Sequence, residues 1–141
     1  MLKISAISDD MRKSLLIIIS ALIVFMFVGC SRNIELKALK SMKITNGNET
    51  FNVDPEQDAE TFDTISALIR GEKLRNINCS LSDVNIYVIN RHNEEMRLQP
   101  SADSDYVLIE EGKDIYYIQL THFDMQMLIH TITSFTGFSI G

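Results

Sequence analysis

The segment VNIYVINRHNEEMRLQPSADSDYVLIEEGKDIYYIQL, residues 84–120, decides the fold of this chain. It is rich in β-branched and aromatic residues, and polar turn sequences interrupt it at regular intervals. RHNE and EGKD each close a hairpin, and Gly112 supplies the turn of the second one. The segment therefore predicts four strands that pair as hairpins, at 84–90, 95–99, 106–110 and 115–120.

Two of these strands are apolar on both faces. Residues 84–89 and 115–120 place hydrophobic side chains at odd and even positions alike, whereas a half-buried strand alternates. We therefore expect both strands at the centre of the sheet, covered on each side.

The residues upstream add one more hairpin. From Ile34 to Thr45 apolar and polar side chains alternate with a period of two, which predicts a half-buried strand. The turn NGNE contains Asn46-Gly47, a strong hairpin signal, and TFNV at 50–53 returns as a second, shorter strand.

Between these two groups of strands the period changes to that of a helix. Asp54 has the position of an N-cap, Pro55 that of the first helical residue, and Gln57 stands at the capping-box spacing. Gly71 is expected to end the helix, and residues 72–83 are interpreted as a connection. The apolar stripe of this helix consists of Phe62, Ile65, Leu68 and Ile69.

A second helix is predicted over 121–135, with Thr121 as its N-cap. The element order is then ββαββββα, which indicates the α+β class: a mainly antiparallel sheet of about six strands with two amphipathic helices. We expect a single domain over 34–136, followed by a tail at 137–141. The stripe of the second helix consists of Met125, Leu128, Ile129, Ile132 and Phe135.

The N-terminal part of the chain has the layout of an export signal. In MRKSLLIIISALIVFMFVGCSR, residues 11–32, a basic pair precedes an uncharged run of 15 residues that ends at Gly29. The last four residues before Ser31, FVGC, resemble the lipobox of bacterial lipoproteins, although Phe27 stands where an aliphatic residue is usual. The resemblance implies cleavage after Gly29 and a lipid on Cys30. The alternative is an uncleaved signal anchor, for which the run is short.

Several boundaries follow from this interpretation. Residues 1–29 form the signal peptide, and residues 30–33 form the lipidated N-terminus and a short tether. Asp9 and Asp10 weaken the basic region, so that residues 1–10 are a candidate misassigned leader and Met11 the better start.

The element order, the size and the leader together are similar to small lipoprotein domains of Firmicutes, of the YhfM-like type. The first helix carries Asp58, Phe62 and Ile65 at that family's spacing, and the last strand carries Tyr117, Ile118 and Leu120. The resemblance implies an extracytoplasmic location and no assigned chemistry.

Charge and cysteine content exclude several classes of function. Residues 30–141 carry 10 Lys and Arg against 17 Asp and Glu, a net charge of −7, which disfavours a nucleic-acid partner. With Cys30 acylated, Cys79 has no disulfide partner and is interpreted as a small buried hydrophobe or a free thiol. No cofactor is indicated, and the oligomeric state is not determined by the sequence.

Motifs for catalysis or metal binding are absent from the sequence. The three histidines, His92, His122 and His130, form no metal-ligand pair, and the DSD at 103–105 lacks the rest of a calcium loop. A candidate binding surface consists of side chains typical of binding hot spots, although tyrosine is also common in ordinary strands: Tyr87, Arg91, Arg97, Tyr116 and Tyr117.

The function we expect is that of a small, non-enzymatic binding or accessory module of the cell envelope. The lipid on Cys30 would hold it on the extracytoplasmic side of the cell membrane, where an envelope protein is a candidate partner. The alternative is an envelope enzyme of unrecognised type that uses Cys79 or a histidine.

Overall fold

The computed structural model describes residues 13, 33–36 and 38–140. Gly29 and Cys30, the expected cleavage and lipidation positions, lie outside the described residues, as do residues 1–12. All members of the hydrophobic core lie between Ile34 and Phe138, within one compact unit that begins at Ile34. We therefore expect this unit to fold by itself.

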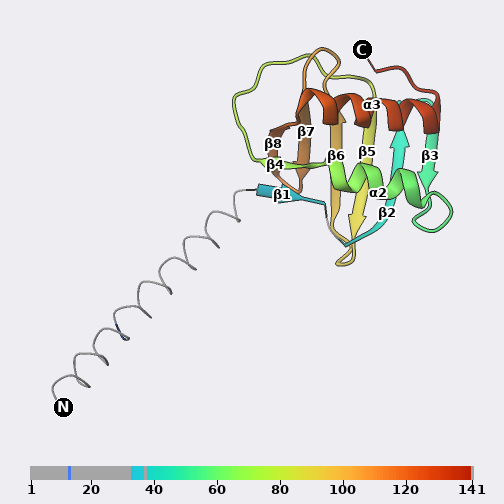
Figure 1. Cartoon of the computed structure of the whole chain (residues 1–141), viewed down its shortest axis with the longest axis horizontal. Coiled ribbons are helices and arrows are strands. Elements are labelled where there is room, and N and C mark those ends of the chain that lie inside the picture. The colour runs from blue at the N-terminus through green and yellow to red at the C-terminus, as the bar shows by residue number, and fades with distance from the viewer. Residues whose placement is uncertain (1–12, 14–32, 37, 141) are drawn as a thin grey trace, which may run out of the picture. The chain divides into compact units, whose positions relative to one another are not determined.

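Six strands form one antiparallel sheet in the order β3-β2-β5-β6-β7-β8 (Figure 1). With two helices packed on it, the sheet confirms the expected α+β class. The four strands predicted from 84 to 120 begin and end within one residue of their expected bounds. The strands are β2 (Leu39–Thr45), β3 (Thr50–Val53), β5 (Asn85–Asn90), β6 (Glu95–Pro100), β7 (Tyr106–Glu111) and β8 (Asp114–Gln119).

The strand expected from Ile34 to Thr45 is interrupted, which corrects the prediction of one continuous strand. Ala38 has a φ of 55°, so the backbone turns there and the alternation on either side belongs to two different sheets. Upstream of the break, β1 (Asn33–Glu35) pairs with β4 (Arg70–Glu72) in a small two-stranded sheet.

Helix α2 (Ala59–Leu68) begins later than Asp54 and Pro55 predict. Asp54 does cap a turn, because its carboxylate accepts hydrogen bonds from the backbone N–H groups of Glu56 and Gln57 at 2.7 and 3.0 Å. These N–H groups, that of Gln57 first, lower the pKa of Asp54. The turn continues to Asp58, and the helix starts after it.

Gly71 does not end helix α2, contrary to expectation. The helix ends at Leu68, and Gly71 lies in β4 with a φ of 151°. A Cβ at this position would lie in ordinary contact with the Ile118 side chain at 3.6 Å, so that the positive φ, rather than a lack of space, favours glycine.

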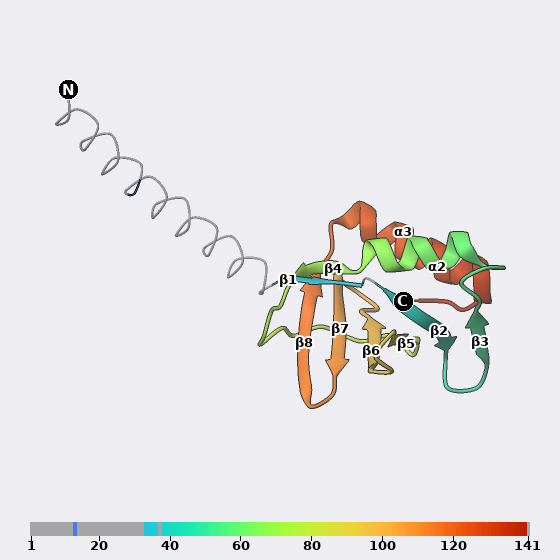
Figure 2. The same cartoon turned by 90° about the horizontal axis from the view of Figure 1, so that it is seen from below.

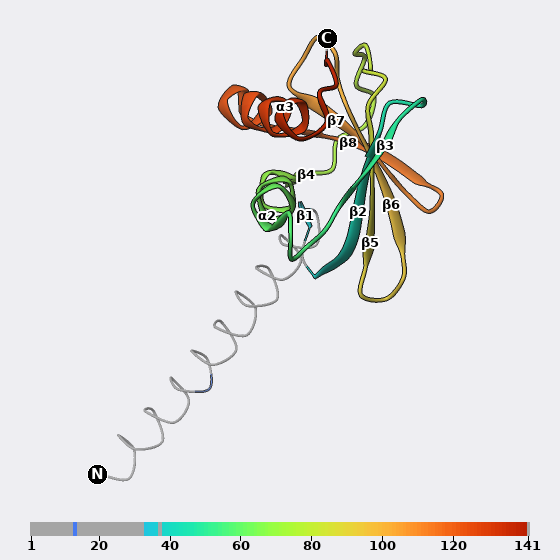
Figure 3. The ribbon, with the colours of Figure 1, turned by 90° about the vertical axis from the view of Figure 1, so that its right-hand side faces the viewer.

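Both helices lie on the same side of the sheet (Figures 2 and 3). Helix α3 (His122–Thr136) begins as predicted, with the Thr121 side chain accepting a hydrogen bond from the backbone N–H of Asp124 at 3.1 Å. The stripes that face the sheet include Phe62 and Ile65 of α2 and Leu128 and Ile132 of α3, all of them buried. These contacts close the core over one face of the sheet.

The C-terminal stretch, expected as a tail, contributes to this core. Phe138 is buried, and its ring packs edge-on against Phe51 of β3, with 5.4 Å between the ring centroids. Phe135 at the end of α3 contacts the same Phe51 ring at 6.3 Å. The end of the chain thus holds α3 against β3.

Strand β8 is the last strand of the sheet, not a central one, which corrects a second expectation. β5 does lie inside the sheet, but the helices cover only one of its faces. The outer edge of β8 is occupied by the connection after β4, where Leu74 and Tyr117 exchange two backbone hydrogen bonds of 2.8 Å. Arg75 adds a hydrogen bond from its guanidinium to the backbone oxygen of Ile115. The backbone of this edge is therefore paired, while the apolar side chains of β8 divide between the core, which contains Tyr116 and Ile118, and the exposed Ile115.

Candidate functional site

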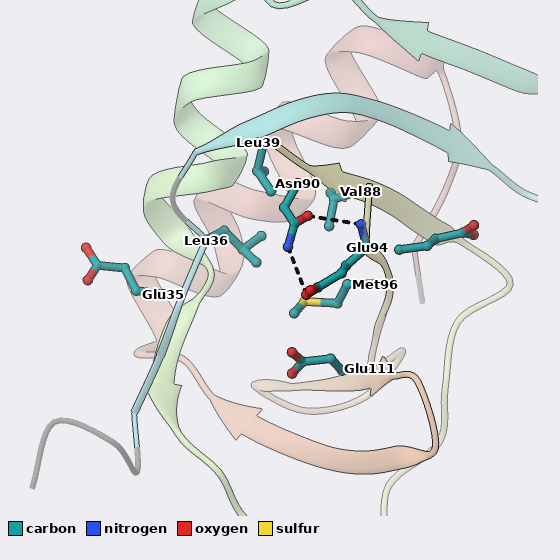
Figure 4. A pocket seen from close by; sticks show the side chains of 9 residues that line it. Glu35, Leu36, Leu39, Val88, Asn90, Glu94, Met96 and Glu111 are labelled. Carbon is teal, nitrogen blue, oxygen red and sulfur yellow. Dashed lines mark hydrogen bonds between the residues drawn. The ribbon is translucent and has the colours of Figure 1, made fainter. Parts of the chain in front are cut away.

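A pocket of about 180 Å³ opens at the end of the sheet where β5 turns into β6 (Figure 4). Its walls combine aliphatic side chains with four glutamates from three different parts of the chain. The segment around β1 closes one side and the β5–β6 hairpin the other. The lining residues are Glu35, Leu36, Leu39, Val88, Asn90, Glu94, Glu95, Met96 and Glu111.

Two carboxylates point toward the interior of this pocket. Figure 4 shows Glu94 and Glu111 on either side of Met96, whereas the carboxylate of Glu35 points away. Leu36 and Val88 are buried and give the pocket an apolar wall. The pocket thus presents negative charge above a hydrophobic surface, and we call it the acidic pocket.

Each of the two carboxylates is held by a neighbouring side chain. The Asn90 amide donates to Glu94 at 3.2 Å, and the Tyr116 hydroxyl donates to Glu111 at 3.1 Å. Tyr116 is buried, and this burial, together with the charge of Glu111, raises the pKa of its hydroxyl well above the ordinary value. Tyr116 therefore remains a neutral donor that orients Glu111.

The local sequence explains how Glu94 reaches the pocket. The Asn90 side-chain oxygen accepts hydrogen bonds from the backbone N–H groups of His92 and Glu94, at 2.9 and 3.0 Å. Asn93 takes the left-handed conformation, with a φ of 61°, which asparagine tolerates well. The sequence predicts Glu94 only as the last residue of the turn RHNE, and the signal missed there is the pair of asparagines, Asn90 and Asn93.

The opposite side of the sheet, which we call the open face, carries no helix (Figure 3). On it, one residue from each of five neighbouring strands lies in register, so that their side chains form a line across the sheet. We call this line the central row: Lys43, Tyr87, Arg97, Glu110 and Ile115.

Arg97 organises the middle of the central row. Its guanidinium donates to Glu110 from two nitrogens, at 2.6 and 3.1 Å, and to the side-chain oxygens of Asn85 and Gln99, at 2.9 and 2.7 Å. The Lys43 ammonium lies over the Tyr87 ring, 5.0 Å from its centroid. The row is thus an ordered polar network rather than a set of free side chains.

The structure brings together only part of the candidate binding surface. Tyr87 and Arg97 are direct cross-strand neighbours, and Tyr117 lies on the same open face. Tyr116 points to the helix side and is 1% exposed, so it contributes to the acidic pocket through Glu111 and not to the open face. Arg91 lies exposed in the β5–β6 turn.

A second, smaller hollow of about 110 Å³ lies on the open face at one end of the central row. Lys43 and Tyr87 line it together with residues of β2, β3, β5 and β6. Glu95 lines both this hollow and the acidic pocket, so that the β5–β6 hairpin separates the two.

Catalytic and metal-binding arrangements are missing from the described part of the chain. No cluster of three potential metal ligands occurs among those residues. His122 contacts Asp105 at 3.2 Å, but no hydroxyl or thiol in residues 33–36 and 38–140 forms a hydrogen bond with a histidine side chain. Cys79 is partly exposed in the connection between β4 and β5.

Comparison with known proteins identifies no relative of this chain: no family model, curated protein or solved structure matches it. Within the described residues, none of the helices has the length and apolar character required to span a bilayer.

Proposed function

We propose that this protein is a membrane-anchored, extracytoplasmic lipoprotein that acts as a small, non-enzymatic binding module of the cell envelope. The observation that carries the binding role is the acidic pocket, in which Glu94 and Glu111 lie beside an apolar wall. A lysine or arginine side chain matches this combination, because its methylene stem packs on apolar surface while its charged end contacts carboxylates. The expected ligand is therefore a basic segment of another envelope protein.

The location follows from the sequence of the leader. Cys30 after Gly29 supports a lipidated N-terminus, and only residues 31–33 separate it from Ile34. A tether of this length reaches about 14 Å when fully extended. The pocket wall around Leu36 then stays close to the outer surface of the membrane, where membrane proteins present their extracytoplasmic segments.

The anchor is tested by metabolic labelling with a fatty acid. The parent protein should take up the label and partition with membranes, since two acyl chains suffice for stable anchoring. Cys30→Ser should abolish the label and leave a larger, uncleaved precursor. If the parent protein takes up no label and Cys30→Ser has the same mass as the parent, the segment is an uncleaved signal anchor instead.

The pocket is tested by titration of residues 33–141 with an N-acetylated, amidated peptide that carries one lysine between glycines. Glu94→Gln and Glu111→Gln should each weaken binding by up to about fivefold, because an exposed ion pair contributes at most about 1 kcal/mol. Glu49→Gln, in the exposed β2–β3 turn, is the matched control. If a peptide with norleucine in place of the lysine binds equally well, the carboxylates do not select a cation.

The alternative function, an enzyme that uses Cys79 or a histidine, has a direct test. A nucleophilic cysteine reacts rapidly at neutral pH because it exists partly as the thiolate. Rapid alkylation of Cys79 in the folded protein, compared with the same protein in urea, would favour this alternative. Protection relative to the unfolded chain would remove its best nucleophile.

A further inference from the structure

The charges of the central row are complementary to those of a second copy of the row that runs in the opposite direction. Counted from β2 to β7, it reads Lys43, Tyr87, Arg97 and Glu110, so that a cation stands at one end and an anion at the other. A twofold axis that runs along the strands between β5 and β6 would place a second copy of the row antiparallel to the first. Lys43 of each copy would then face Glu110 of the other, and Tyr87 would face Arg97.

The neighbouring row follows the same symmetry. Asn85 and Gln99 are cross-strand neighbours on β5 and β6, since Ile86 pairs with Leu98 in the adjoining position. The twofold axis would bring the Asn85 amide of one copy opposite the Gln99 amide of the other. Both amide oxygens already accept hydrogen bonds from Arg97, and the Gln99 amide also donates to the backbone oxygen of Ser82, so that these groups keep their partners when the face is covered.

Covering the open face would leave few groups without a partner. Arg97 already donates four hydrogen bonds within its own chain, and the two that go to Glu110 end on the same carboxylate oxygen, Oε2. Burial of charge is costly mainly when the charge is unpaired. Lys43 is the exception: within the described residues it contacts the Tyr87 ring and no carboxylate. A carboxylate from a second molecule would complete its coordination.

One apolar side chain of the open face is strongly exposed, whereas Leu108 in the neighbouring row is buried. Ile115, at the β8 end of the central row, is 52% exposed. Six strands spaced about 4.8 Å apart and about 20 Å long present close to 600 Å² to a partner. Two such faces reach the lower limit of a specific interface, about 1,200 Å² in total, which fits a weak dimer.

We propose that two copies of this protein associate through their open faces, in the register set by Lys43 and Glu110, as a weak, symmetric dimer. Sheets that pack face to face align within about 30° of each other, which the common twist of two identical sheets allows. If the proposed lipid anchor holds the chains on one membrane, their effective concentration reaches the millimolar range and favours this weak contact. The dimer itself does not depend on the anchor or on the acidic pocket.

Sedimentation of residues 33–141, at concentrations up to about 1 mM, tests the proposal independently of any ligand. Wild-type protein should show a reversible monomer–dimer equilibrium. Lys43→Glu and Glu110→Lys should each weaken association at least tenfold, because each places like charges opposite one another twice. An equimolar mixture of the two variants should recover association to within about threefold of wild type, since both opposed pairs are then restored.

Two further variants keep the result interpretable. Lys113→Glu, in the exposed β7–β8 turn, changes the net charge by the same amount outside the open face and should leave association unchanged. Ile115→Asp changes the cross-strand neighbour of Glu110 but keeps both Arg97 and Glu110, and it should reduce association. This variant covers the case in which Glu110→Lys fails to fold. Wild-type protein that stays monomeric, a mixture without recovery, or an Ile115→Asp variant that dimerises normally would each overturn the proposal.

Discussion

Arg97 on β6 and Glu110 on β7 face each other across the open face, and two guanidinium nitrogens share one Glu110 oxygen at 2.6 and 3.1 Å. The Arg97 side chain is 25% exposed and that of Glu110 41%, so that the pair is only partly screened by water. Arg97→Met should lower the free energy of unfolding by about 1–2 kcal/mol, because Asn85, Gln99 and Glu110 all lose their donor. Urea unfolding measures this loss.

Arg91→Met provides the control for Arg97. Arg91 is exposed in the β5–β6 turn, and its side chain has no hydrogen bond or ion pair within the described part of the chain. Its replacement should change the free energy of unfolding by less than about 0.5 kcal/mol. Equal losses for the two variants would mean that the network around Arg97 does not stabilise the sheet.

Phe62→Ala should lower the free energy of unfolding by about 3–5 kcal/mol. The Phe62 ring is 7% exposed and forms part of the core between α2 and the sheet. Its neighbour Asp63 is exposed on the same helix, so Asp63→Ala serves as the comparison in the same urea titration. A cost for Phe62→Ala below about 1 kcal/mol would place this ring outside the core.

Tyr116→Phe should lower stability at neutral pH by about 1 kcal/mol, because Glu111 loses the hydroxyl that donates to it. The pKa of Tyr116 is raised in the folded protein, so that above the ordinary value of 10.0 only the unfolded chain releases this proton. The contribution of the hydroxyl is therefore complete below pH 10 and falls as the pH rises further. Urea titrations on both sides of pH 10 should show the two proteins converging, and a constant difference would contradict the assignment.

Asp54→Asn should lower the thermal midpoint at neutral pH, since the ionised carboxylate is the better acceptor for the N–H groups of Glu56 and Gln57. These hydrogen bonds lower the pKa of Asp54 in the folded protein below its ordinary value of 3.8. The advantage of the wild type is therefore present above that value and disappears as the pH falls through the lowered pKa. Thermal unfolding at neutral and strongly acidic pH tests this, with Asp63→Asn as the comparison.

The parts of the fold that the sequence predicted well depend on local signals. Each strand of the β5–β8 meander is bounded by polar turn residues, and Thr121 caps α3 through a hydrogen bond to a residue three positions away. Such interactions are encoded by neighbouring residues, which is why the element bounds were predicted almost correctly.

The predictions from sequence were wrong where segments far apart in the chain determine the local structure. The strand break at Ala38 allows β1 to pair with β4, more than thirty residues away in the chain. Likewise, β8 is shielded by Leu74 and not by a seventh strand. The acidic pocket was missed for the same reason, because Leu36, Glu94 and Glu111 meet only after the sheet has formed. The choice of tyrosines and arginines from the sequence identified part of the open face. It did not predict that Tyr116 points to the helix side of the sheet.

The backbone contact between Leu74 and Tyr117 has a consequence for aggregation. An unpaired edge strand can accept an extended segment of another chain, which is the first step toward amyloid-like stacking. On β8 that position is already filled by Leu74, and Arg75 holds the adjoining Ile115 carbonyl. The other edge, β3, is only four residues long and lies between Glu49 and Asp54, whose charges repel an identical edge. Crowded molecules of this protein are therefore protected from uncontrolled growth of the sheet at both of its ends.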